Sequence, residues 1–302
     1  MFSDKNNTLK KAAAWASVST AVLLCLIKGA AVFLTGSLSI MSSMVDSLSD
    51  ILSSLITMAA VHFSVKPPSE NHRYGYGKAE SISAMIQAAF IVGSAVFIFY
   101  DGFDRLIHPQ VVEKTDVGIV IMVISLIITL LLIGFQRYVI KKTNSTAIIA
   151  DSAHYNVDVL SNAAVIVSLA VVHYIGWQWC DIVMALFISI YLLISGIKLA
   201  GQAVAEITDH EIDAEIKEKI VHLARSSEGV KGCHDLRTRV SGAQIFIEIH
   251  LEFDGRQSLY ETHRLSNIVE QKIMRICPQA QVIVHQDPYG IRERRLDHEI
   301  KD

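Results

Sequence analysis

The sequence predicts a membrane protein in which an all-α bundle of six transmembrane helices is followed by a small α+β domain. Three observations lead to this prediction. The 302 residues are 51% apolar and only 19% charged, whereas globular chains are about 25% charged. Six apolar stretches each approach the roughly 20 residues that a helix needs to cross a hydrocarbon core of about 30 Å. Polar character returns after about residue 208, and residues 209–302 hold seven of the twelve histidines.

The six predicted transmembrane helices make up a domain of residues 1–207. The first could be read as a signal peptide, because Lys5, Lys10 and Lys11 precede it. Five further spans follow and no clear small-residue cleavage site is visible, so we expect it to be retained. The predicted spans lie near residues 13–34, 40–63, 82–100, 117–138, 147–172 and 182–203.

Basic residues in the connections predict the orientation of the chain. They gather before the first span, between the second and third, and between the fourth and fifth, as in Lys11, Arg73 and Lys141. The connections on the other side carry few. Because short cytoplasmic loops are enriched in Lys and Arg, we expect both termini to be cytoplasmic.

The segment after the last span predicts a compact domain over residues 208–290. Residues 213–227 and 258–276 have helical spacing, while residues 234–240, 244–253 and 281–285 read as strands. In the second strand, Ile245, Ile247, Ile249 and Leu251 alternate on one face. The order α-β-β-α-β favours helices packed on one side of a sheet. Residues 291–302 are expected to be a flexible, charged tail.

Composition excludes several other classes of protein. Disorder needs low hydrophobicity and high net charge, but this chain has a mean hydropathy of +0.38 and a net charge of −3. Lys plus Arg number 27 against 30 Asp plus Glu, so nucleic acid is not an expected partner. Four scattered cysteines are too few for a disulfide scaffold.

Ionisable residues lie inside two of the predicted spans. Asp46 and Asp50 are one helical turn apart in the second span, as are His154 and Asp158 in the fifth, so each pair shares a helix face. Each would cost roughly 2.5–3.5 kcal/mol near the centre of a membrane. No Lys or Arg lies deep in either span. The alternative is that these residues are helix caps or loop residues at misplaced span ends. We expect Asp151 to lie near a helix end and do not count it among the metal ligands.

A divalent cation would neutralise this group of side chains. Three carboxylates and one imidazole supply four ligands, which suits tetrahedral Zn²⁺. Metal binding requires deprotonated ligands, so protons could replace a departing metal. The spacing therefore predicts an intramembrane site that exchanges metal for protons.

These motifs resemble those of the cation diffusion facilitators, and in particular the bacterial zinc and ferrous-iron efflux pumps. The resemblance rests on the six spans, the two four-residue pairs, the segments 71–80, 150–155 and 234–239, and the C-terminal α-β-β-α-β order. It implies a ferredoxin-like or metallochaperone-like cytoplasmic domain. It also implies a homodimer in the cell inner membrane, in contact with lipid, that exchanges cytoplasmic metal for protons at Asp46, Asp50, His154 and Asp158.

The resemblance also implies metal ligands outside the membrane. Zinc ligands of the cytoplasmic domain in relatives correspond here to His234, His250, His263, His285 and Asp287. Taken singly, each histidine is more often a surface or packing residue. We expect zinc at these ligands to sense cytoplasmic metal or to hold the dimer together.

Two further features of the family are only partly present. In the loop after the second span, relatives carry an Asp and two histidines, where this chain has Ser69, His72 and Tyr76. With Glu70 as the only substitute, we expect at most a weak loop site, and a solvated histidine is the alternative. A charge pair that interlocks relatives at the membrane boundary corresponds to Lys78 and Asp209, which could instead be solvated.

The resulting hypothesis is a secondary transporter that exports Zn²⁺, with Fe²⁺ or Cd²⁺ as other candidate substrates. An intramembrane metalloenzyme would need an open coordination position and a general base, and the H-E-x-x-H motif is absent. A metal-sensing membrane receptor would use the C-terminal histidines but would not need buried acids on two spans. An uptake transporter would differ only in direction.

Overall fold

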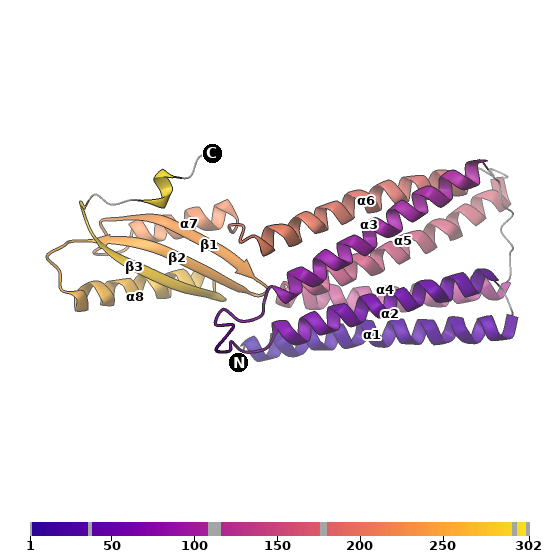
Figure 1. Cartoon of the computed structure of the whole chain (residues 1–302), viewed down its shortest axis with the longest axis horizontal. Helices are drawn as coiled ribbons and strands as arrows, with labels where there is room; N and C mark the ends of the chain where they lie inside the picture. The colour runs from indigo at the N-terminus through magenta and orange to yellow at the C-terminus, as the bar shows by residue number, and fades with distance from the viewer. Residues whose placement is uncertain (1, 36–37, 108–115, 176–179, 292–294, 300–302) are drawn as a thin grey trace. The chain divides into compact units, whose positions relative to one another are not determined.

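The computed structural model describes residues 2–35, 38–107, 116–175, 180–291 and 295–299. The chain divides into two compact units, Met1–Val204 and Ala205–Asp302. We call them the membrane unit and the C-terminal unit and describe each by itself. The coiled ribbons and arrows of Figure 1 identify their elements.

The membrane unit contains six long helices among the described residues: α1 (Phe2–Thr35), α2 (Leu38–Ser64), α3 (Ala79–Ile107), α4 (Asp116–Thr143), α5 (Thr146–Ile175) and α6 (Cys180–Ile207). All are longer than the predicted spans. The predicted ends mark where apolar residues stop, whereas backbone hydrogen bonding continues through Lys5, Lys10 and Lys11, which are good helix formers.

Five of these helices, α1, α2, α3, α4 and α6, contain described segments long and apolar enough to cross a membrane. Helix α5 is not among them. It is the helix that carries Asp151, His154 and Asp158. The chain is therefore a multi-pass membrane protein.

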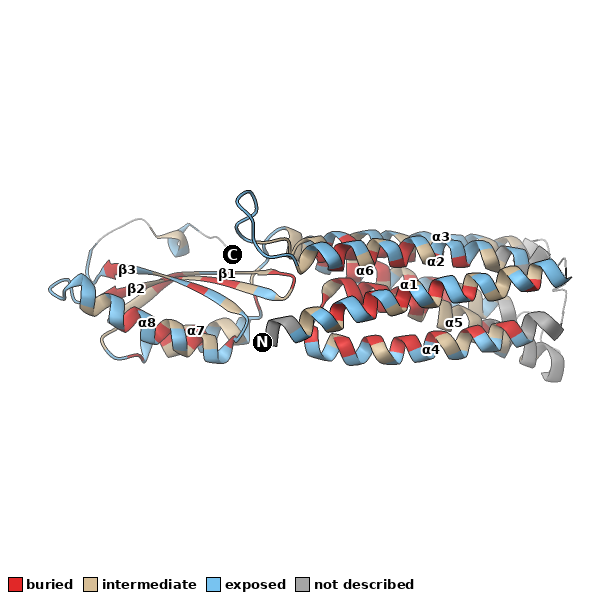
Figure 2. Cartoon of the chain, turned by 90° about the horizontal axis from the view of Figure 1, so that it is seen from below, coloured by how far each residue is buried: buried red, intermediate tan, exposed pale blue. Residues whose placement is uncertain are grey.

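The two largest buried clusters of the membrane unit contain many small residues. One core joins α3, α5 and α6 through residues such as Ala88, Ala150 and Leu192. The other joins α1, α2, α4 and α5 through residues such as Ala14, Val61 and Val139. Small side chains allow close approach of helices in lipid. Figure 2 shows buried residues on the inward stripes of the helices and exposed ones outside.

The C-terminal unit contains α7 (Ala214–Arg225), β1 (Gly232–Ser241), β2 (Gln244–Phe253), α8 (Leu259–Ile276) and β3 (Ala280–Pro288). The predicted α-β-β-α-β order is confirmed. Strand β2 is central, antiparallel to β1 and parallel to β3. Ser258 begins α8 by accepting a hydrogen bond from the Glu261 backbone N–H at 3.3 Å, as expected of a helix N-cap.

One face of this sheet is apolar and the other is polar. Ile247, Ile249 and Leu251 of β2 pack against Ile220 of α7 and Val269 of α8. Both helices lie on that side of the sheet (Figure 2). Because side chains alternate along a strand, the residues between these apolar ones, including His250, point to the opposite face. We call this opposite face the open face.

Residues after β3 fold back onto the unit in the part of the tail that is described. Leu296–His298 form a 3-10 turn. The backbone N–H groups of Leu296 and Asp297 each donate to the Asp235 carboxylate at 2.9 Å, and Asp235 N–H donates back to Asp297 at 2.9 Å. The predicted flexible tail therefore has defined contacts over residues 295–299.

Candidate metal sites

The first candidate site lies between α2 and α5. Asp50, His154 and Asp158 each place a ligand atom within 4.8 Å of the others. His154 Nε2 lies 3.2 Å from Asp50 Oδ1. Asp50 and His154 are buried, with 9% and 7% of their surface exposed. The one-turn spacing of His154 and Asp158 places both toward α2, so three of the four predicted transport ligands come together.

One ring nitrogen of His154 has no hydrogen-bond partner in the described part of the chain, while the other faces Asp50. The Nδ1 atom is buried and has no hydrogen-bond partner among the described residues. The rings of Phe90 and Tyr155 lie edge-on to it at 6.4 and 5.9 Å. A buried polar atom without a partner is unusual in a folded protein, and a ligand of the site would satisfy it.

Asp46 is the predicted ligand that lies outside this group. Its side chain is exposed, and it is not among the three residues with ligand atoms within 4.8 Å. Four residues along a helix also correspond to about 6 Å of rise. Asp46 interacts electrostatically with Asp50 and with Lys28 of α1.

Lys28 is a neighbour of the site that the sequence analysis missed. It is half-buried, and its ammonium donates to the Ser43 carbonyl at 3.1 Å and to the Ser47 hydroxyl at 2.8 Å. It interacts electrostatically with Asp158 as well as with Asp46. A lysine is costly inside a transmembrane segment, and that cost could have drawn attention to it from sequence alone.

Asp151 belongs to a different polar cluster. It is 1% exposed and accepts hydrogen bonds from Ser17 at 2.6 Å, Gln136 at 2.7 Å and Thr57 at 3.3 Å. These donors come from α1, α4 and α2. The carboxylate is thus satisfied by protein donors and ties four helices together.

The second candidate site lies on the open face of the C-terminal unit. In the strand register, His234 pairs with His250, and His250 pairs with His285. Asp287 is two residues beyond His285 on the same face. Ligand atoms of His234, His250 and Asp287 lie within 4.8 Å of one another. The sheet therefore aligns these residues in one row.

Asp287 is the centre of this second site. One of its oxygens lies 2.8 Å from His250 Nδ1 and 3.5 Å from His234 Nε2, and the other lies 3.2 Å from His285 Nε2. Two or three imidazoles with one buried carboxylate match the donor types that Zn²⁺ prefers. His263, the fifth predicted ligand, is exposed on α8, where its Nε2 lies 3.3 Å from Asn267, and it is not in this group.

The structure gives positions for the predicted loop ligands and for the predicted charge pair of Lys78 with Asp209. His72 stacks against Tyr76 with ring centroids 4.6 Å apart, and both His72 and Glu70 are exposed. No group of three ligands is found in this loop within the described residues. Lys78 belongs to the membrane unit, while Asp209 belongs to the C-terminal unit and lies 3.6 Å from Arg239. The pairing of Lys78 with Asp209 stays a prediction.

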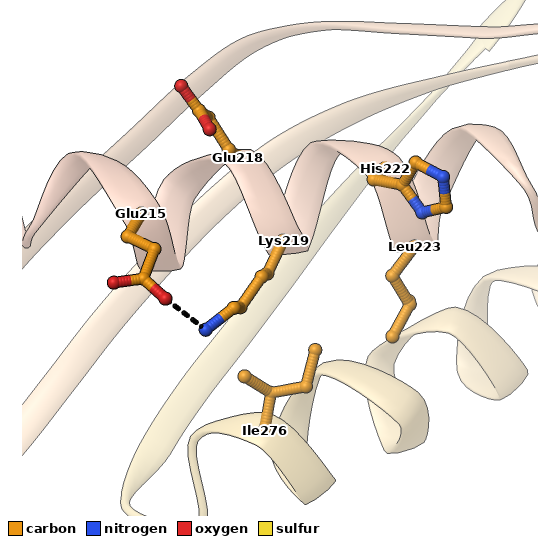
Figure 3. A pocket seen from close by; sticks show the side chains of 6 residues that line it. All are labelled: Glu215, Glu218, Lys219, His222, Leu223 and Ile276. Atoms are coloured by element: carbon orange, nitrogen blue, oxygen red, sulfur yellow. Dashed lines mark hydrogen bonds and ion pairs between the residues drawn. The ribbon is translucent and has the colours of Figure 1, made fainter.

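A shallow groove between α7 and α8 has no comparable chemistry. Figure 3 shows the apolar ends of Leu223 and Ile276 beside Glu215 and Lys219 of α7, which are 2.6 Å apart. The hydrogen bond and the charge of Lys219 lower the pKa of the Glu215 carboxyl. This groove brings together no group of three metal ligands among the described residues.

Comparison with known families accounts for both units. Residues 14–208 match the family model of the cation efflux transmembrane domain. Residues 212–289 match that of the cation efflux protein cytoplasmic domain. The chain belongs to the cation diffusion facilitator family. Its sequence resemblance to this family is thereby confirmed, and the chain is a transporter rather than an enzyme.

Relatives match along almost the whole length. The cation-efflux pump FieF of Serratia proteamaculans is 42% identical over 283 residues, which cover 94% of each chain. The pump of the same name from Citrobacter koseri is 43% identical over 282 residues, covering 93% of this chain and 94% of its own. A solved structure of CzrB in its zinc form covers 28% of this chain and 99% of its own, at 31% identity and a TM-score of 0.26.

Proposed function

We propose that this protein exports Zn²⁺ from the cytoplasm in exchange for protons. The observation that carries the proposal is the convergence of Asp50, His154 and Asp158, within 4.8 Å, on two membrane-unit helices. The unpartnered Nδ1 atom of His154 supports it. Membership of a cation-efflux family with full-length relatives named as pumps supports the direction.

The donor set supports zinc as the substrate. Carboxylate oxygens and an imidazole nitrogen bind Zn²⁺ at about 2.0–2.2 Å. Fe²⁺ and Cd²⁺ accept the same donors, while the absence of thiolate and thioether among the predicted ligands disfavours Cu⁺. Asp46 supplies the fourth ligand when α2 and α5 shift during alternating access around the site.

Protons take the place of the metal on its outward release. The ligands must be deprotonated to bind metal, and His154 is the side chain best suited to exchange a proton near neutral pH. The orientation follows from the basic cytoplasmic connections. The working form is a homodimer in the cell inner membrane, with both termini cytoplasmic.

Transport by purified protein in liposomes tests the site. Asp50→Ala should abolish Zn²⁺ flux and the proton flux coupled to it. The matched control is Asp104→Ala, which removes an acid of α3 that is outside the described metal group and should leave both fluxes intact. Persistent flux in Asp50→Ala would refute this site, and assaying Fe²⁺ and Cd²⁺ in the same liposomes identifies the preferred metal.

A metal-sensing receptor is the second candidate function. The cluster of His234, His250 and Asp287 favours it, because those ligands alone would be enough to detect cytoplasmic metal. A receptor would bind Zn²⁺ but move none across liposomes, so the flux measurement separates the two functions.

A further inference from the structure

A buried carboxylate that is not among the predicted ligands lies beside the metal group of the C-terminal unit. Glu252 is 6% exposed, although glutamate is almost never buried without a partner. Its Oε1 atom lies 2.9 Å from His234 Nδ1. In the strand register Glu252 pairs with Asp287, so it shares the open face with the metal group.

The sheet makes room for this carboxylate. Gly232 of β1 is the register partner of Glu252 across the strand pair. A Cβ atom built at Gly232 would lie 2.8 Å from Glu252 Oε2, which is closer than such contacts occur. A larger residue at position 232 would therefore push this carboxylate aside.

The contact fixes which nitrogen of His234 faces the metal. An ionised carboxylate only accepts hydrogen bonds, so Nδ1 of His234 carries the hydrogen. Nε2 is then the nitrogen that can bind metal, and it lies 3.5 Å from Asp287. A carboxylate that holds the second nitrogen of a ligating histidine orients the ring and raises its basicity.

Residues 295–299, which we call the C-terminal segment, also contact the Oε1 atom of Glu252. Arg295 Nη2 donates to Glu252 Oε1 at 2.6 Å. Asp235, which directly follows His234, holds the next two residues of the segment by accepting from the N–H groups of Leu296 and Asp297. Asp235 has a φ of +48° at the register shift between His234 and Arg237. The segment is thus anchored to the backbone that carries His234.

We propose that Glu252 is a positioning residue for a cytoplasmic metal site and that the C-terminal segment tunes this site through Arg295. The proposal rests on metal binding by His234, His250 and Asp287. The guanidinium draws charge from Glu252 and weakens its hold on His234, and it also repels a divalent cation. The segment therefore lowers metal affinity while it is docked, and its release raises the affinity.

Substitutions of Glu252 and of Arg295 should change the metal affinity in opposite directions. Glu252→Ala should weaken metal binding by about tenfold or more, as the loss of such supporting carboxylates typically does. Glu252→Gln should weaken it less, because the amide oxygen still accepts from His234. Arg295→Gln should strengthen binding by about threefold, the scale of a partly exposed charge pair.

Cobalt binding to the full-length protein measures these effects. Co²⁺ is titrated in the Asp50→Ala background, which disables the proposed transport site, and its visible absorption reports the geometry of the imidazole ligands. The control is Arg237→Gln, which removes another open-face arginine that pairs with Glu248 at 3.2 Å and should change affinity less than about twofold. Thermal unfolding shows whether each variant is folded.

The double variant decides whether Arg295 acts through Glu252. If it does, Arg295→Gln should have a much smaller effect in the Glu252→Gln background than alone. Equal effects in both backgrounds, or an unchanged spectrum and affinity in folded Glu252→Ala, would overturn the proposal. If His234→Ala also leaves Co²⁺ binding unchanged, the metal site itself is absent, and both the site and the proposal fail.

Discussion

Lys28 gives the intramembrane site a fixed positive charge. Its ammonium is held by Ser43 and Ser47 of α2, within electrostatic range of Asp46 and Asp158. With Asp46 joined to Asp50 and Asp158 as proposed, and with a neutral histidine, the four-ligand site would carry three negative charges. Lys28 lowers this to two, which balances a divalent cation. In the proposed site the lysine would therefore make the metal-loaded state neutral, the charge state that costs least in a membrane.

We expect Lys28→Gln to change both the affinity for metal and the rate of its release. Without the ammonium, the site holds a cation more tightly, so the KM for Zn²⁺ should fall by about tenfold, a typical size for one partly buried charge. The maximal rate should fall too, because the metal leaves more slowly. Initial Zn²⁺ flux in liposomes, measured against Zn²⁺ concentration, gives both values.

Lys198→Gln is the matched control for this variant. Lys198 is also a lysine of a transmembrane helix, α6, but it is exposed. It should leave the KM unchanged. An unchanged KM in Lys28→Gln as well would mean that this charge does not act on the metal.

The sequence predicted most, but not all, of the residues around the two candidate metal sites. One-turn pairs placed His154 and Asp158 on one face, and the uncompensated charge with the family resemblance predicted that Asp46 and Asp50 would join them. Of these two, only Asp50 lies in the described group. Spacing says nothing about contacts between helices, and so it missed Lys28, whose partners lie on α2. It also missed Glu252, because a glutamate in an alternating strand appears from sequence to be an ordinary polar residue.

Gly196 of α6 lies close to α3. A Cβ atom built at Gly196 would lie 2.7 Å from Val92 and 3.2 Å from Ile91. Gly196→Ala should therefore destabilise the protein by about 1–3 kcal/mol, as overpacking does. Thermal unfolding in detergent measures the change. Gly201→Ala is the control on the same helix, because nothing lies within 4 Å of its added Cβ, and a midpoint as low as that of Gly196→Ala would contradict the packing explanation.

A buried ion pair joins α1 to the start of α3. Lys10 and Glu80 are 2% and 0% exposed and lie 2.6 Å apart. Glu80 also accepts from Ser64 at 2.8 Å and Ser145 at 2.5 Å. Span prediction from hydropathy placed Lys10 before the first membrane span. The structure instead continues α1 past this residue, so that the lysine is buried.

Removing one member of this pair should be strongly destabilising. Lys10→Met leaves the Glu80 carboxylate buried without its cation, which typically costs about 3–5 kcal/mol. Glu80→Gln in the same protein should recover part of the loss, because it removes the uncompensated charge. Unfolding midpoints of the single and double variants measure both effects. Lys11→Met removes the exposed neighbour and should change little; an equal loss there would show that burial of the pair is not the cause.

At the scale of the whole molecule, the sequence predicted one unit that lies in the membrane and one that lies in water. Alternating Ile245, Ile247, Ile249 and Leu251 predicted one apolar sheet face, and α7 and α8 cover that face. The open face could not be interpreted in the same way, because its function depends on register between three strands. Only the pairing of His234 with His250 and of His250 with His285 turns separate histidines into one metal group.

This metal group leads to a prediction about the assembly of the chain. His285 is in contact with Asp287 at 3.2 Å, yet 65% of its side chain is exposed, so a metal bound there would keep positions open to ligands from a second copy. Chelation should then shift the protein in detergent toward monomers, and Zn²⁺ should reverse the shift. Mass measurement of the protein–detergent complex follows the change.

A combined His234→Ala and His285→Ala variant should no longer respond to Zn²⁺. His222→Ala, on α7 in the groove of Figure 3, should respond as the unaltered protein does. A response to Zn²⁺ that survives the loss of both histidines would place the metal-dependent contact elsewhere in the chain.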